Sequence, residues 1–273
     1  MKKMYLLVLV CVLALGQSIP MKAGVKAEPV KKEKAEQDSV RVLWIGNSYT
    51  YFNDLPKMVQ ELAATKKMKM ACTRVVKGGA RFSGHLENEN LLKLLKEGGW
   101  DYVVLQEQSA NPAKPTGMVA QEVYPYAQKL CELARKGSPK AKIIFYMTWG
   151  HKYGNLQQQV ENYPLDDTYA GMQERLKTSY LEMAYDNNAW CAPVGMAWKQ
   201  VREERPYCIL YKPDMSHPSV RGSYLAANVL FATIWQKNYQ TEYNAGLDDE
   251  EAEYLQQVAI SMVMKNKNLL NIK

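Results

Sequence analysis

The chain has 273 residues, of which 47% are hydrophobic, and this content suffices to bury one large core. Its formal net charge is +7, which falls to +5 if Lys2 and Lys3 leave with an N-terminal leader (7 minus 2). This excess is modest, and the basic residues are not interleaved with aromatic ones. Composition therefore argues against nucleic acid as a partner.

The first residues, MKKMYLLVLVCVLALGQSIPMKAG, have the layout of a secretory signal peptide, with a basic start, an apolar run and then small and polar residues. We expect a signal peptide over residues 1–23, cut after Gly16 or after Ala23. The apolar run is short for a bilayer, so no stable membrane span is expected after cleavage, and an uncleaved anchor is the alternative. Such a leader predicts export to the periplasm or the cell exterior.

Residues 24–39 carry charges of both signs and lack aromatic residues, which is typical of a solvated linker. We therefore expect one folded domain over residues 40–273.

Export would place the remaining cysteines in an oxidising compartment, where they could pair. They are Cys72, Cys131, Cys191 and Cys208, and their spacing matches no metal-binding motif, so no metal site is predicted. Cys131 and Cys191 fall in apolar segments and are typical of core residues. Cys191 with Cys208 is the pair that we would test for a disulfide.

From Val40 onward, short apolar runs alternate with longer segments of helical periodicity. The runs predict five strands, and strands joined by helical crossovers form a parallel sheet covered on both faces. The fold class is therefore α/β. The expected strands lie within 40–46, 70–76, 100–106, 141–149 and 188–195, and the expected helices lie within 55–67, 86–98, 120–135, 168–185, 219–236 and 247–265.

Function in such sheets gathers where the strands end. Four short polar stretches follow predicted strands and should meet at that edge. They are Gly46–Ser48, Lys77–Ala80, Gln106–Ser109 and Thr148–His151.

Ser48 follows a strand that ends on Gly46, where a serine is more often a helix cap than a nucleophile. A serine hydroxyl needs a base, and the chain has only three histidines, His85, His151 and His217. His217 precedes a proline, which favours an extended turn, and Asp214 stands three residues before it. Asp214 could hold the far nitrogen of the His217 ring, as in a serine triad, or the two could form a surface ion pair or half of a metal site.

Acyl transfer also needs hydrogen-bond donors for the oxyanion. Gly78 and Gly79 follow a predicted strand, and a glycine lets its backbone N–H approach a developing charge. Gln106 and Gln108 end the next strand, where an amide side chain could donate a further bond. The alternative is an ordinary turn and solvated glutamines.

These residues resemble the four blocks of the SGNH (GDSL-type) hydrolase superfamily, in the same chain order. GNSYT is similar to the serine block, KGGARFSG to the glycine block, and DMSHPS to the last block. The resemblance implies a flavodoxin-like three-layer α/β/α sandwich. It also implies that Ser48 is the nucleophile, His217 the base and Asp214 the orienting acid, with the Ser48 and Gly79 backbone N–H groups in the oxyanion hole.

Two positions depart from the superfamily pattern. Asn47 stands where an aspartate is usual before the serine. The amide block, usually Gly-x-Asn-Asp, reads Gln106-Glu107-Gln108-Ser109 here, which puts Gln108 at the position of the third oxyanion donor. This form of the block resembles an exported branch of the superfamily.

We therefore expect an exported serine esterase that removes acyl groups, acetyl first, from carbohydrate. Gln106, Trp149 and His151 are candidate substrate contacts, because aromatic side chains at the strand edge suit a sugar ring. The alternatives are a lipase- or thioesterase-like hydrolase and a catalytically weak carbohydrate-binding protein. The partner would be a small-molecule or polysaccharide ester, and no cofactor is predicted because no glycine-rich phosphate loop follows the first strand.

Overall fold

The computed structural model describes residues 39–155 and 165–273. The predicted signal peptide and all but the last residue of the predicted linker lie outside these ranges, so cleavage and export remain predictions. Within the described ranges, no helix combines the length and the hydropathy needed to cross a membrane.

The domain is built on a five-stranded sheet in the order β2-β1-β3-β4-β5, with every neighbouring pair parallel. This arrangement confirms the predicted parallel sheet and its flavodoxin-like form. The central strands are almost wholly buried, as expected for a sheet covered on both faces. The strands are β1 (Val40–Gly46), β2 (Met70–Val76), β3 (Tyr102–Leu105), β4 (Lys142–Tyr146) and β5 (Trp190–Ala192).

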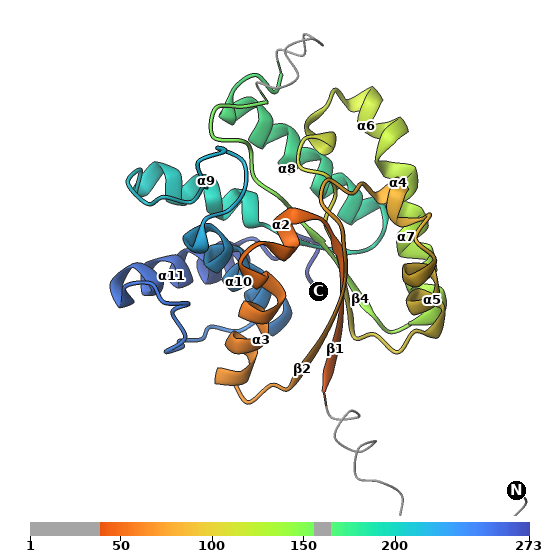
Figure 1. Cartoon of the computed structure of the whole chain (residues 1–273), viewed down its shortest axis with the longest axis horizontal. Coiled ribbons are helices and arrows are strands. Elements are labelled where there is room, and N and C mark those ends of the chain that lie inside the picture. The colour runs from red at the N-terminus through yellow and green to blue at the C-terminus, as the bar shows by residue number, and fades with distance from the viewer. Residues whose placement is uncertain (1–38, 156–164) are drawn as a thin grey trace, which may run out of the picture. The chain divides into compact units, whose positions relative to one another are not determined.

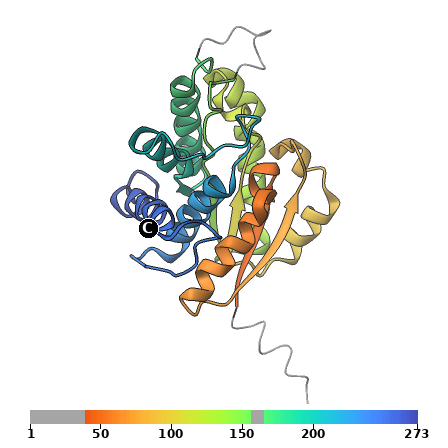
Figure 2. The same ribbon diagram turned by 60° about the vertical axis from the view of Figure 1, so that its left-hand side comes forward.

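Helices cover both faces of the sheet and complete three layers (Figure 1). On one face lie α3 (Leu55–Thr65), α10 (Val220–Trp235) and α11 (Asp249–Lys265), with α9 (Val194–Glu204) packed beside α10 and α11. On the other face lie α5 (Glu89–Glu97), α7 (Tyr124–Gly137) and α8 (Tyr169–Asp186), and the turned view in Figure 2 separates the two layers. Short elements lie in the loops: α2 (Ser48–Tyr51), η1 (Phe52–Asp54), α4 (Phe82–His85), η2 (Asn111–Ala113) and α6 (Thr116–Glu122).

Two helix predictions need correction. The segment 120–135, expected to be one helix, contains the end of α6 and most of α7, which are separated at Val123. Pro125 lies in the first turn of α7, where its missing N–H costs no helical bond, so the chain restarts a helix there. Helix α9 was not predicted, although Val194, Trp198 and Val201 form a helical apolar stripe that the structure buries.

The four cysteines of the described domain are free thiols. The Cys191–Cys208 disulfide considered above is therefore wrong. Cys191 lies in β5 inside the core, whereas the Cys208 thiol lies 3.7 Å from a carboxylate oxygen of Glu251. Cys131 and Cys191 are buried, as predicted for core residues.

The order of the strands fixes where a site can form. Strand β1 pairs with β2 on one side and with β3 on the other, so the connections that leave β1 and β2 run in opposite directions. A crevice opens at such a reversal, beyond the carboxyl ends of the strands. Figure 1 shows α2 directly at that end of β1.

Candidate active site

Ser48 begins helix α2 immediately after β1 and is 9% exposed. The Asn47 side chain caps this helix, because its Oδ1 accepts a hydrogen bond from the Tyr49 backbone N–H at 3.1 Å. Its Nδ2 donates to the Ala80 carbonyl at 3.1 Å, which a carboxylate could not do. The asparagine at this position thus joins the serine loop to the glycine loop.

Gly46 is required by the close packing at the end of β1. A Cβ at this position would lie 2.4 Å from Thr50 Oγ1 and 2.7 Å from Gln106 Oε1. Any larger residue would therefore displace the loop that carries Ser48.

Ser48 and the Asp214–His217 pair, which lie far apart in the sequence, form one hydrogen-bonded relay. His217 Nε2 lies 2.8 Å from Ser48 Oγ, and His217 Nδ1 lies 2.8 Å from Asp214 Oδ2. The imidazole can take a proton from the hydroxyl only if Nδ1 carries the ring proton, and the Asp214 carboxylate favours that tautomer. The arrangement can activate a serine for nucleophilic attack.

The Asp214 carboxylate is held by its own turn. Its Oδ1 accepts hydrogen bonds from the backbone N–H groups of Ser216 at 3.0 Å and His217 at 2.8 Å. Burial acts to raise the pKa of Asp214, but these bonds and the His217 ring outweigh burial and lower the pKa below its ordinary value. Asp214 therefore stays ionised, as an orienting acid must.

The histidine loop is tied to the serine loop by side chains on both sides. Asn53 Nδ2 donates to the carbonyls of Pro218 and Ser219, each at 3.1 Å. The Tyr49 hydroxyl lies 2.6 Å from Ser216 Oγ. These bonds fix the distance between Ser48 and His217 across the loops.

Trp149 supports the relay from below and is wholly buried. Its ring stacks on Tyr49 at 4.5 Å between centroids and on Trp198 at 3.9 Å, and its indole N–H donates to the Ser216 carbonyl at 3.1 Å. The expectation that Trp149 contacts substrate is therefore wrong, because protein covers both faces of the ring. Exposed aromatic rings nearby are those of Tyr51 and Tyr153.

Gly79 has a φ of +66° and lies in an exposed turn in which the Ala80 N–H donates to the Lys77 carbonyl. Only glycine adopts this backbone conformation at little cost. The bond from Asn47 to Ala80 holds this turn beside Ser48. The Ser48 and Gly79 backbone N–H groups, both expected oxyanion donors, are thus carried on two loops that are bonded to each other.

The two glutamines of the amide block have different roles. Gln106 is wholly buried, and its Oε1 accepts hydrogen bonds from the Asn47 N–H and the Thr50 hydroxyl, each at 2.9 Å. Gln106 is therefore a support of the serine loop, and the expectation that it contacts substrate is wrong. Gln108 Oε1 accepts from the N–H groups of Ala110 at 2.8 Å and Asn111 at 3.0 Å, and its amide nitrogen donates one N–H to Ser109 Oγ at 3.4 Å, so its second N–H is the one that remains to donate.

Glu107 joins the glycine loop to the amide block, a role that the sequence did not reveal. Its carboxylate accepts hydrogen bonds from the N–H groups of Phe82 and Gln108, each at 2.7 Å. Burial raises the pKa of Glu107 to about 7, although these bonds oppose the shift. The sign of this role in the sequence is that a glutamate lies at the end of a strand, within a buried run of residues.

The other two histidines are placed differently from His217. His85 is buried, and its Nε2 lies 2.9 Å from the Gly46 carbonyl, so it supports the strand end. His151 Nε2 lies 3.3 Å from Ser109 Oγ. Burial, and next the charge of His217, lowers the pKa of His151 to about 4, so this ring is neutral near pH 7. His151 remains a candidate substrate contact.

Across the described ranges, no group of three or more histidine, cysteine or acidic side chains could hold a metal ion.

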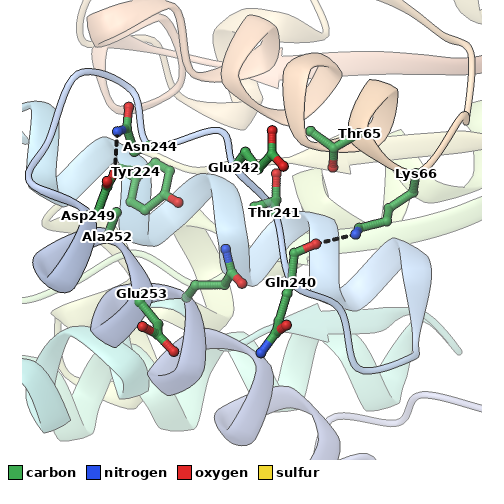
Figure 3. A pocket seen from close by; sticks show the side chains of 11 residues that line it. Thr65, Lys66, Tyr224, Gln240, Thr241, Glu242, Asn244, Asp249, Ala252 and Glu253 are labelled. Carbon is green, nitrogen blue, oxygen red and sulfur yellow. Dashed lines mark hydrogen bonds between the residues drawn. The ribbon is translucent and has the colours of Figure 1, made fainter.

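A separate polar groove of about 790 Å³ lies between α3, α10 and α11, in the helical layer on one face of the sheet (Figure 3). It is lined by the end of α3, the first turns of α11 and the segment between α10 and α11. None of Ser48, Asp214 and His217 lines this groove. The triad and this groove are therefore distinct regions.

Comparison with known proteins relates the chain to solved structures, whereas no family model and no curated protein matches it. A protein assigned as an SGNH hydrolase from Slackia heliotrinireducens is 29% identical, with a TM-score of 0.58 over 72% of this chain and 99% of that chain. A DUF4886 family protein from Bacteroides uniformis is 18% identical, with a TM-score of 0.66 over 86% of this chain and 97% of that chain. A variant of an acetyl xylan esterase from Geobacillus stearothermophilus is 16% identical, with a TM-score of 0.51 over 74% and 97%.

The last two structures are too distant in sequence to show more than a common fold. The first is closer, it is matched over nearly its whole length, and this chain brings its serine, glycine and Asp-x-x-His segments together at one sheet edge. On these grounds the chain belongs to the SGNH hydrolase superfamily.

Proposed function

We propose that the chain is an exported serine esterase that removes acyl groups, acetyl first, from carbohydrate. The observation that carries the proposal is the pair of 2.8 Å hydrogen bonds that links Ser48 Oγ to His217 and His217 to Asp214. A hydroxyl in this arrangement loses its proton to the imidazole as it attacks a carbonyl carbon.

In the first half of the reaction, Ser48 Oγ bonds to the ester carbonyl carbon and His217 Nε2 receives the hydroxyl proton. The carbonyl electrons move onto the oxygen, where the Ser48 and Gly79 N–H groups can stabilise the charge. When the tetrahedral intermediate collapses, the bond to the alcohol oxygen breaks and His217 returns the proton to that oxygen. The products are a free alcohol and an acyl group on Ser48.

In the second half, water attacks the acyl-serine while His217 takes one of its protons. Collapse of this intermediate releases the carboxylic acid and returns the proton to Ser48 Oγ. Asp214 remains ionised throughout and stabilises the imidazolium in both halves. The third oxyanion donor is assigned to Gln108, whose amide nitrogen has a second N–H beyond the one bonded to Ser109 Oγ at 3.4 Å.

The proposed substrate is supported by observations other than the triad. One solved structure of similar fold is an acetyl xylan esterase, which favours an acetyl group on a sugar. Export rests on the basic and apolar character of residues 1–23.

Hydrolysis of p-nitrophenyl acetate tests the chemistry, with the protein compared against its Ser48→Ala and His217→Ala variants. We expect turnover by the parent and a loss to background in both variants, each of which should keep the parent's melting temperature. A fluorophosphonate should add its mass to the Ser48 peptide of the parent and leave Ser48→Ala unlabelled. Equal turnover by the parent and a folded Ser48→Ala variant would overturn the proposed mechanism.

A further inference from the structure

Basic side chains surround the triad on the described surface, and they lie on both sides of Ser48. Lys77 and Arg81 flank the glycine turn, and both are exposed. Lys152 and Lys212 lie on the histidine side. The charge around the site is therefore positive, beyond the modest excess of the chain as a whole.

Lys212 is held close to the His217 ring. Its backbone N–H donates to the His217 carbonyl at 2.8 Å. Its ammonium lies 4.5 Å from the centre of the Phe52 ring, and that ring lies 4.5 Å from the His217 ring. The Lys212 ammonium thus packs on the Phe52 ring, and the same ring packs against the catalytic imidazole.

Lys152 approaches the same turn from the loop after β4. Its backbone N–H donates to the carbonyl of Met215, which lies between Asp214 and His217. Its ammonium lies 5.5 Å from the centre of the Tyr153 ring, which is 55% exposed.

Within the described ranges, Lys77, Arg81, Lys152 and Lys212 form no ion pair. Of the acidic groups near them, Asp214 serves the relay, Asp54 pairs with Arg74, and the charge of Arg81 acts on the buried Glu107, whose pKa it lowers. Asp167 lies on the segment whose backbone packs against Gly154, next to Lys152. An unpaired positive rim at a site mouth attracts anions and raises their local concentration.

The mechanism shows which part of the substrate meets Lys212 and Lys152. His217 must deliver its proton to the leaving alcohol oxygen, so the alcohol lies on the His217 side of Ser48. The acyl oxygen lies on the Gly79 side. A charge that binds near Lys212 and Lys152 is therefore carried by the alcohol and not by the acyl group.

We propose that the preferred substrate is an acylated acidic sugar whose carboxylate is bound by Lys212 and Lys152. This inference rests on the proposed esterase function and narrows its substrate class. A neutral acetylated sugar would be hydrolysed by the same triad, but it would bind more weakly and therefore with a higher KM. The two lysines act on binding and not on the chemical step.

The experiment compares acetate release from an O-acetylated methyl glucuronoside and from the matching methyl glucoside, which differ only at C6, a carboxylate in the first and a hydroxymethyl group in the second. At low ionic strength we expect kcat/KM to favour the glucuronoside by about 3- to 10-fold, the range for one or two exposed ion pairs. The double variant Lys152→Gln, Lys212→Gln should bring this ratio close to 1, through KM and not kcat, and 0.5 M salt should do the same in the parent. Lys140→Gln, an exposed lysine just before β4 at the opposite edge, is the matched control and should keep the ratio.

The outcomes separate the two proposals. Equal hydrolysis of both sugars by the parent would overturn the charge preference and leave the esterase intact. Hydrolysis of p-nitrophenyl acetate without release from either sugar would overturn the sugar-acid substrate. A parent that turns over no ester and leaves Ser48 unlabelled would overturn the esterase, and the inference with it.

Discussion

Two polar regions of the molecule, the triad at the carboxyl ends of the strands and the groove in one helical layer, differ in how their side chains are bonded. The groove between α3 and α11 has a volume of about 790 Å³ and is lined by acidic, amide and hydroxyl side chains. At the triad, the hydrogen bonds run in one series from Asp214 through His217 to Ser48. A large number of polar groups thus does not by itself mark the reactive region.

The bonds in the groove connect parts of the fold. Asn244 Nδ2 donates to Asp249 at 2.8 Å, and the Lys66 ammonium donates to the Gln240 carbonyl (Figure 3). Both bonds attach the segment between α10 and α11 to neighbouring helices. At the triad, the series of hydrogen bonds ends at the Ser48 hydroxyl, which can give its proton to His217 and attack a carbonyl carbon. The difference shows that a site for this chemistry needs an ordered series of hydrogen bonds that ends in a reactive group, and that a deep groove alone is not enough.

The largest expected effect is at the far end of the relay. In Asp214→Asn, the neutral amide can neither hold the His217 Nδ1–H in its direction nor stabilise the imidazolium. We expect kcat for p-nitrophenyl acetate to fall by about 10³- to 10⁴-fold with an unchanged fold. Asp186→Asn, an exposed acid at the end of α8, is the control, and a loss below tenfold in Asp214→Asn would remove Asp214 from the relay.

Next in size is the support beneath the triad. Trp149→Ala removes a buried ring stacked between Tyr49 and Trp198 and the donor to the Ser216 carbonyl. We expect the free energy of unfolding in urea to fall by about 3–5 kcal/mol. Tyr207→Ala, whose side chain is 94% exposed, should stay within about 0.5 kcal/mol of the parent. An equal, small effect in both variants would show that the stack does not support this edge.

Trp149 also shows where sequence reasoning reaches its limit. Alternation of apolar runs located every strand, because a buried parallel strand is apolar on both faces. The Asp-x-x-His-Pro order placed Asp214 and His217 in one turn, because both residues are close in the chain and the proline restricts the backbone. Such local signals suffice for the fold and for the histidine side of the relay.

The roles of Trp149 and Gln106 depend on which residues pack against each side chain in the fold. A tryptophan after a strand suits both an exposed platform and a buried support, and only Trp198, which stacks on it from α9, decides between them. Gln106 likewise lies at a strand end, but Asn47 and Thr50 cover its amide oxygen. These partners come from other segments, so the sequence around each residue carries no sign of them.

A smaller effect is expected from Glu107, which links the two loops that flank the oxyanion position. Its folded pKa of about 7 lies above its ordinary value of 4.5, because burial opposes ionisation. Between these values the folded state binds more protons than the unfolded state, so this group lowers stability as pH rises. We expect the parent to lose about 1–3 kcal/mol relative to Glu107→Gln from pH 4.5 to 7, and no more above it.

Urea unfolding of both proteins at several pH values measures this difference. Glu132→Gln, an exposed acid on α7, controls for substitution of a glutamate at the surface and should run parallel to the parent. A constant difference between the parent and Glu107→Gln over the same range would show that Glu107 ionises with its ordinary pKa.

The smallest effect is expected in the groove and completes the comparison. Glu253→Ala removes a carboxylate that lines it and whose hydrogen bond is made one turn along the same helix, to Gln257 at 3.0 Å. We expect kcat/KM for p-nitrophenyl acetate to stay within about twofold and stability within about 0.5 kcal/mol, as for surface changes elsewhere. A loss of activity here, with the fold intact, would mean that the groove acts on Ser48 through α3, whose first residue follows the serine loop. The two regions would then be one functional unit, and the separation argued from their bonding would fail.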